Sequence, residues 1–266
     1  METLQNSNLK PRRGIYLLPN LFTTGAMFAG FYAIVDAIAG HFTDAAIAVF
    51  VAGLLDGLDG RVARLTNTQS EFGTQYDSLS DMVSFGIAPA LVTYTWTLYS
   101  LQEYGTFWGK VGWCAAFLYA ACAALRLARF NTQVRVIDKR YFQGLSSPAA
   151  AGLMMSFVWA VSDRQMDGHN VTVQLIAPVL IVLAGLLMVS KIRYFSFKAW
   201  PLSDKVPFFW IPVVVIVFVA LALDPPRMLF VIALLYVASG PIFTLWGLRR
   251  KREQRGHVRS EERTGE

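Results

Sequence analysis

Long apolar runs separated by short polar stretches limit the folds open to this chain of 266 residues more than any other feature. A helix of about 20 residues crosses a bilayer. Runs near this length can be placed eight times, at approximately 15–39, 43–65, 72–99, 107–129, 146–162, 170–190, 207–223 and 228–248. Lipid cannot satisfy exposed backbone polar groups, and no alternating barrel pattern is present. The sequence therefore predicts an all-α, polytopic membrane helix bundle of about eight transmembrane helices.

Basic residues fall mainly on one side of these spans. With an even number of spans, 21 of the 24 Lys and Arg residues lie on the side that carries both ends of the chain. Cytoplasmic loops are enriched in cations, so both termini are expected to be cytoplasmic. The apolar segment after Lys10, Arg12 and Arg13 is too long for a signal peptide, and no convincing cleavage pattern follows it.

Three regions are expected. Residues 1–14 form a basic cytoplasmic arm, residues 15–248 the membrane domain and residues 249–266 a charged cytoplasmic tail. The mixed charges of the tail favour a disordered extension held near anionic headgroups. The 191–205 loop mixes cations with aromatic residues, as interfacial anchors do.

Four aspartates gather between residues 56 and 81, within otherwise apolar surroundings. Asp56 and Asp59 are three residues apart and Asp77 and Asp81 are four apart, so each pair shares one face if its segment is helical. The polar stretch 66–71 suits a short connection between antiparallel helices. The two pairs are therefore expected to meet at the cytoplasmic side.

Four carboxylates in a membrane-like setting cannot all stay charged without a counter-ion, because desolvation and repulsion oppose it. A cation must therefore be bound. Oxygen ligands with no Cys or His in the stretch favour Mg²⁺ or Mn²⁺ over zinc.

Polar residues elsewhere allow two interpretations each. Asn20 is either a ligand contact at the cytoplasmic surface or a capping residue. Arg126 and Arg129 share a helix face and are either positive-inside anchors or ligands for anionic lipid phosphates. Gly57 and Gly60 lower helix propensity, which indicates close approach of a ligand or another backbone.

The central stretch also carries a long motif with fixed spacing. It comprises Asp56-x2-Asp59-Gly60-x2-Ala63-Arg64-x8-Gly73-x3-Asp77-x3-Asp81. This motif resembles the signature of the CDP-alcohol phosphotransferase family of integral membrane enzymes, in which a small alcohol displaces CMP from a CDP-linked lipid.

The resemblance implies a role for each matching residue. Asp56, Asp59 and Asp77 would be ligands of two divalent cations, and Asp81 would contact the second cation and act as general base. The residues expected at the CDP moiety are Asn20, Asp56, Gly60, Arg64 and Gly73.

Further segments resemble the phosphatidylserine synthase branch of that family. They are 18–24 (LPNLFTT), 126–131 (RLARFN), 142–151 (FQGLSSPAAA) and 188–198 (MVSKIRYFSFK). This resemblance implies CDP-diacylglycerol and L-serine as substrates, a homodimer and a place in the cell (inner) membrane. Arg126, Arg129 and Asn131 are candidates for binding lipid phosphate or the serine carboxylate.

Two alternatives stay open. Another family acceptor, such as glycerol 3-phosphate or an inositol phosphate, would need more cations beside the site. An ion or metal transporter would place carboxylates near the bilayer midplane among broken helices. A synthase with paired His-x-Lys nucleophile motifs is excluded because the sequence has no such motif.

Overall fold

The computed structural model describes residues 17–66, 68, 70–133, 141–164, 168–195 and 210–264, and nearly all of them are helical. Each of the eight predicted spans falls on a helical segment. The regular helices are α1 (Leu17–Ile38), α2 (Phe42–Leu65), α5 (Thr106–Gln133), α6 (Ser147–Ser162), α7 (Val171–Val189), α8 (Trp210–Leu223) and α9 (Pro225–Thr264). The third span is a series of short helices: α3 (Glu71–Asp81), η2 (Met82–Ile87), α4 (Ala88–Thr93), η3 (Tyr94–Leu98) and η4 (Tyr99–Tyr104).

Four of the described segments are long and apolar enough to cross a bilayer. They are Pro19–Ile38, Thr106–Thr132, Val171–Val189 and Pro225–Thr244. Large apolar side chains such as Phe28 and Leu175 are more than two-thirds exposed on these helices. Since hydrocarbon can cover such surfaces, the chain is a multi-pass membrane protein.

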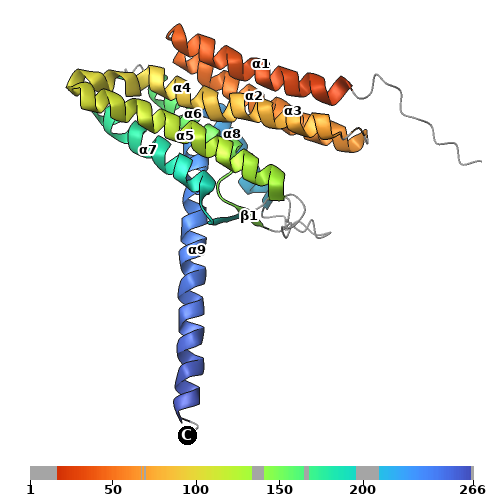
Figure 1. Cartoon of the computed structure of the whole chain (residues 1–266), viewed down its shortest axis with the longest axis vertical. Helices are drawn as coiled ribbons and strands as arrows, with labels where there is room; N and C mark the ends of the chain where they lie inside the picture. Colours follow the sequence, from red (N-terminus) through yellow and green to blue (C-terminus); the bar gives the residue numbers. More distant parts are fainter. Residues whose placement is uncertain are drawn as a thin grey trace, which may run out of the picture.

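Small residues let α1 and α2 pack closely along their length (Figure 1). Ala33 on α1 and Ala45 and Ala52 on α2 have no exposed surface and lie in one buried cluster. Without large side chains between them, two backbones can approach, and membrane helices associate through this kind of packing. The close packing of α1 against α2 thus helps to fix the position of the polar end of α2.

The third span departs from the regular helix that its apolar pattern predicts. Met82–Ile87 and Tyr94–Leu98 are π-helical, and Tyr99–Tyr104 is a 3-10 helix. Pro89 has no N–H to give to the carbonyl of Phe85, four residues earlier. The hydroxyl of Tyr119 on α5 donates to that carbonyl at 3.1 Å instead. The loss of a regular helical hydrogen bond at Pro89 is thus compensated by a neighbouring helix.

Two short strands lie among the helices of the predicted all-α bundle. β1 (Tyr141–Gln143) pairs antiparallel with β2 (Arg193–Phe195), and Phe142 lies opposite Tyr194. Gly144 follows β1 with a φ of 81°, and its N–H donates to the carbonyl oxygen of Ile192 at 2.8 Å. A side chain there would meet the carbonyl oxygen of Met188. Only glycine allows this turn without strain.

Tyr194 fastens the β1–β2 pair to α9. Its side chain is fully buried, and its hydroxyl donates to the carbonyl of Val237 at 3.2 Å. Burial raises the pKa of Tyr194 to about 12, so the hydroxyl keeps its proton at neutral pH. The strands therefore form part of the packed structure.

The C-terminal tail is a second departure. We expected residues 249–266 to be disordered, but α9 continues without a break through Thr264 and extends beyond the bundle (Figure 1). Arg, Lys, Glu and Gln dominate this stretch, and all four favour helix. The expected arm 1–14, residues 134–140 and residues 196–205 of the expected anchor lie outside the described residues.

Candidate active site

The polar end of α2 and the start of α3 form the helix–turn–helix that the aspartate spacing predicts. Thr66 follows α2, and its hydroxyl donates to Val62 at 2.8 Å. Ser70 caps α3, and its hydroxyl accepts the N–H of Gly73 at 3.0 Å. Both helix ends thus satisfy backbone groups locally, which fixes the geometry between them.

The two aspartate pairs meet between these helices. Asp56, Asp59 and Asp77 each offer a carboxylate oxygen, and these oxygens lie within 4.8 Å of one another. Asp81 follows Asp77 by one turn on the same face of α3, which extends the acidic face beyond the cluster. The side-chain spacing within each helix and the antiparallel connection together account for this convergence.

Thr23 supports the cluster from α1, and sequence reasoning did not single it out. Its hydroxyl donates to Asp59 Oδ2 at 2.8 Å, and both residues are buried. The hydroxyl of Ser80 on α3 donates to the carbonyl of Thr23 at 3.0 Å. One sequence feature could have pointed to Thr23, namely its place in the 18–24 segment that resembles the phosphatidylserine synthase branch. Its distance in the sequence from any acidic residue gave no indication of a contact with Asp59.

The carboxylate oxygens of the cluster fit a divalent cation. Asp77 Oδ1 and Asp81 Oδ1 are buried and have no hydrogen-bond partner in the described part of the chain. Buried carboxylate oxygens without donors are unfavourable unless a cation neutralises them. No His or Cys belongs to the cluster, and oxygen-only ligation favours Mg²⁺ or Mn²⁺.

The residues expected at the CDP moiety lie on the side of the cluster formed by α1, α2 and the start of α3. A Cβ atom at Gly60 would meet nothing within 4 Å, so space is open there. At Gly73 a Cβ atom would lie 3.6 Å from Asn20 Oδ1, which brings the Asn20 side chain to this side as well. Arg64 is exposed at the end of α2. Tyr76 also borders this region, where its hydroxyl bonds Thr24 at 2.9 Å.

The three polar candidates on α5 separate in the structure. Arg126 Nη1 donates to Ser147 Oγ at 2.7 Å, and the guanidinium attracts Asp81 electrostatically. Asn131 Nδ2 donates to Ser78 Oγ at 3.0 Å, on α3. Arg129 Nη1 lies 3.4 Å from the carbonyl oxygen of Val189. Arg126 is thus held by α6, Asn131 contacts α3 next to Asp77, and Arg129 lies near the end of α7.

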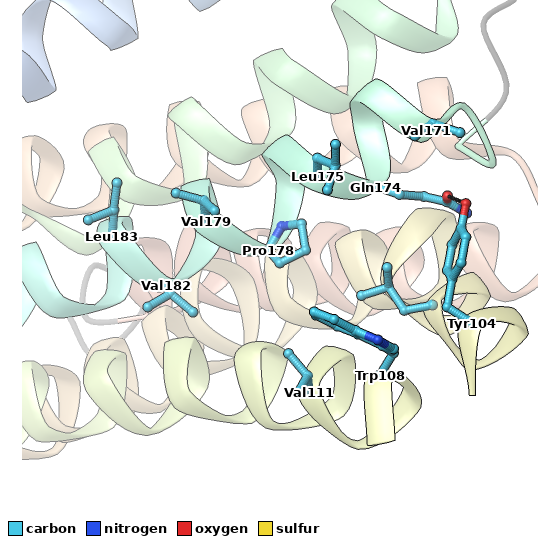
Figure 2. A pocket seen from close by; sticks show the side chains of 11 residues that line it. Tyr104, Trp108, Val111, Val171, Gln174, Leu175, Pro178, Val179, Val182 and Leu183 are labelled. Atoms are coloured by element: carbon cyan, nitrogen blue, oxygen red, sulfur yellow. Dashed lines mark hydrogen bonds between the residues drawn. The ribbon is translucent and has the colours of Figure 1, made fainter. Parts of the chain in front are cut away.

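A separate cavity of about 640 Å³ lies between η4, the start of α5 and the start of α7 (Figure 2). Figure 2 shows Trp108 and Val111 of α5 facing Pro178 and Val182 of α7. Its polar edge is Gln174, whose side chain accepts a hydrogen bond from Tyr104 and donates one to Ser100. No carboxylate lines this cavity, so it lacks the groups needed to bind a cation or activate a hydroxyl.

Known proteins resemble the part of the chain that builds the cluster. A family model described as CDP-alcohol phosphatidyltransferase matches residues 16–190. The chain is 42% identical over 188 residues to a CDP-diacylglycerol–serine O-phosphatidyltransferase of Helicobacter pylori, covering 71% of this chain and 76% of that protein. It is 34% identical over 239 residues to the protein of that name from Mycobacterium bovis, covering 86% of this chain and 79% of that protein.

Proposed function

Because the chain belongs to the CDP-alcohol phosphatidyltransferase family, we propose that it transfers the phosphatidyl group of CDP-diacylglycerol to the hydroxyl of L-serine. The products are phosphatidylserine and CMP. Two relatives that match most of this chain are named for that reaction. The convergence of Asp56, Asp59 and Asp77, with Asp81 one turn further along α3, carries the proposal, because the reaction needs an anionic diphosphate bound beside a base.

Asp56, Asp59 and Asp77 would hold the divalent cations, and Asp81 would complete the second of two sites. The close approach of one oxygen from each of the first three side chains supports this assignment. Two Mg²⁺ or Mn²⁺ ions bound there would neutralise the diphosphate and polarise the phosphorus that is attacked. Thr23 donates to Asp59 Oδ2 and so orients the Asp59 carboxylate within the cluster.

Asn20, Asp56, Gly60, Arg64 and Gly73 surround the CDP moiety. The open space at Gly60 allows the nucleotide to approach the backbone of α2. Arg64 supplies an exposed cation for a phosphate of CDP. Both features lie on the face of the cluster that is built by α2 and the start of α3.

Asp81 acts as general base in a direct displacement. Its unpartnered Oδ1 accepts the proton of the serine hydroxyl, whose oxygen attacks the phosphorus that bears diacylglycerol. The bond from that phosphorus to the oxygen bridging to CMP breaks, and CMP leaves with the bonding pair. Because no protein nucleophile intervenes, the configuration at phosphorus is inverted. Retention would contradict this mechanism.

The protein acts as a homodimer in the cell (inner) membrane, with eight spans, both termini in the cytoplasm and the active site at the cytoplasmic face. The excess of cations on one side of the spans supports this orientation. Arg61 and Arg64 at the end of α2 lie beside the aspartate cluster, on that same side.

An acceptor assay tests the proposal. Purified protein is given CDP-diacylglycerol and radiolabelled serine, glycerol 3-phosphate or an inositol phosphate, with Mg²⁺ or Mn²⁺. We expect label from serine in the lipid product, and CMP in equal amount. Incorporation of glycerol 3-phosphate or an inositol phosphate in place of serine would refute the choice of acceptor while keeping the family chemistry.

The variant Asp81→Asn tests the base. Loss of the proton acceptor should abolish turnover and leave CDP binding largely intact, since the nucleotide lies on the other side of the cluster. Turnover and CMP binding are measured on the same preparation. Normal turnover would show that Asp81 is not the base.

A further inference from the structure

Arg126 on α5 is held in place by α6, and one of its donors is left without a partner. Its Nη1 atom donates to Ser147 Oγ at 2.7 Å, and Ser147 has no exposed surface. Its Nε atom is buried and has no hydrogen-bond partner among the described residues. A buried N–H on a fixed guanidinium is unfavourable unless a ligand accepts a hydrogen bond from it.

The unpartnered donor lies across the helix contact from an unpartnered acceptor. Asp81 Oδ1 is also buried without a partner. Two hydrogen bonds join the facing helices on either side, from Tyr119 to the carbonyl of Phe85 and from Asn131 to Ser78. Arg126 and Asp81 therefore lie on facing stretches of α5 and α3. No ion pair within 4 Å joins them in the described part of the chain. The pair therefore offers a hydrogen-bond donor and an acceptor to a small molecule that carries both an anion and a hydroxyl.

Two anionic groups could meet Arg126: a phosphate of the lipid substrate or the carboxylate of the acceptor. The residues assigned to CDP come from α1, α2 and the start of α3, whereas Arg126 comes from α5 and lies across from Asp81, the last residue of α3. The diphosphate also has the divalent cations to neutralise it. Position therefore favours the acceptor.

L-Serine has the shape that this arrangement requires. Its carboxylate is attached to the carbon next to the hydroxymethyl group, so a hydroxyl placed at Asp81 leaves the carboxylate close by. Guanidinium groups bind carboxylates through short, charge-assisted hydrogen bonds with defined geometry.

We propose that Arg126 binds the carboxylate of the acceptor amino acid, and that Ser147 is a positioning residue that orients the guanidinium for this contact. The inference rests on the proposed function and deepens it, because it assigns the group that distinguishes serine from uncharged alcohols. Asn131 is engaged with Ser78 and Arg129 faces the carbonyl of Val189, so neither takes this role.

The test removes the carboxylate from the substrate and the guanidinium from the protein in turn. Wild type and Arg126→Met are assayed with serine and with serinol, in which a hydroxymethyl group replaces the carboxylate. We expect Arg126→Met to lower kcat/KM for serine by about 10- to 100-fold. It should change kcat/KM for serinol, and KM for CDP-diacylglycerol, by less than about threefold.

Arg164→Met is the matched control, because Arg164 is exposed just beyond the far end of α6. It should leave kcat/KM for serine unchanged. Equal losses with serine and serinol, or a rise in KM for CDP-diacylglycerol in Arg126→Met, would overturn the inference. If wild type itself does not use serine, the proposed function falls and this inference falls with it.

Ser147 gives an independent test that keeps the arginine. Ser147→Ala removes the hydroxyl that holds Nη1, so KM for serine should rise by about tenfold while KM for CDP-diacylglycerol stays unchanged. Ser147→Thr keeps a hydroxyl and should restore most of the affinity. If Ser147→Ala instead lowers kcat/KM for serine and for CDP-diacylglycerol to the same extent, as a general folding defect would, that result would contradict the positioning role.

Discussion

Removal of the Thr23 hydroxyl should weaken cation binding without creating a cavity. Thr23→Val is nearly isosteric, and the hydroxyl it removes donates to Asp59 Oδ2 at 2.8 Å and lies 3.1 Å from the carbonyl of Pro19. Thr23 is 4% exposed and Asp59 6%, so water cannot easily take the place of the hydroxyl. The carboxylate would lose both its orientation and its buried donor.

The expected magnitude follows from these contacts. A hydrogen bond to a charged group contributes about 1.5–3 kcal/mol, which is roughly a 10- to 150-fold change in an equilibrium constant. Loss of outer-shell partners of metal ligands typically costs about 10- to 100-fold in affinity. We therefore expect Thr23→Val to bind Mn²⁺ about 10- to 100-fold more weakly than wild type.

Cation-dependent thermal stability in detergent measures this directly. A cation concentration of 100 times the wild-type Kd stabilises wild type by about 2.7 kcal/mol, and the variant should gain only about 0.4–1.4 kcal/mol. Thr23→Ser keeps the donor and should behave like wild type. Thr95→Val is the control, because the Thr95 hydroxyl bonds only carbonyls of its own span, those of Leu91 and Val92. Wild-type Mn²⁺ affinity in Thr23→Val would refute the reasoning.

Two further predictions concern the packing around the site. Tyr119→Phe removes the buried hydroxyl that donates to the carbonyl of Phe85 and should lower the free energy of unfolding by about 1–3 kcal/mol; an unchanged denaturation midpoint would contradict the role given to this contact. Gly30→Ala would place a Cβ atom 2.6 Å from the Ser84 hydroxyl oxygen and 2.7 Å from its Cα, forcing α1 away from η2. We expect a loss of about 1–3 kcal/mol in stability together with lower turnover. Gly152→Ala, whose nearest neighbour would lie at 3.9 Å, should be tolerated, and equal damage in both variants would argue against a specific role of the α1–η2 contact.

The helical segments could be predicted because apolar runs of bilayer length leave the backbone few choices. The strands β1 and β2 could not, since three-residue segments give no periodic signal and their pairing joins residues about 50 positions apart. The helical tail was misjudged because charge suggested disorder, while the same residues have high helix propensity.

The sequence by itself determined that this is a helical membrane protein with two pairs of aspartates that can share a site, because helix periodicity and the short connection leave little freedom between Asp56 and Asp81. The tertiary structure decided which residues from other helices complete that site. Thr23 donates a hydrogen bond to Asp59 from α1, and Arg126 on α5 is held by Ser147 of α6 across from the end of α3. Such contacts depend on how helices pack against one another, and the local pattern of the chain does not encode which faces meet.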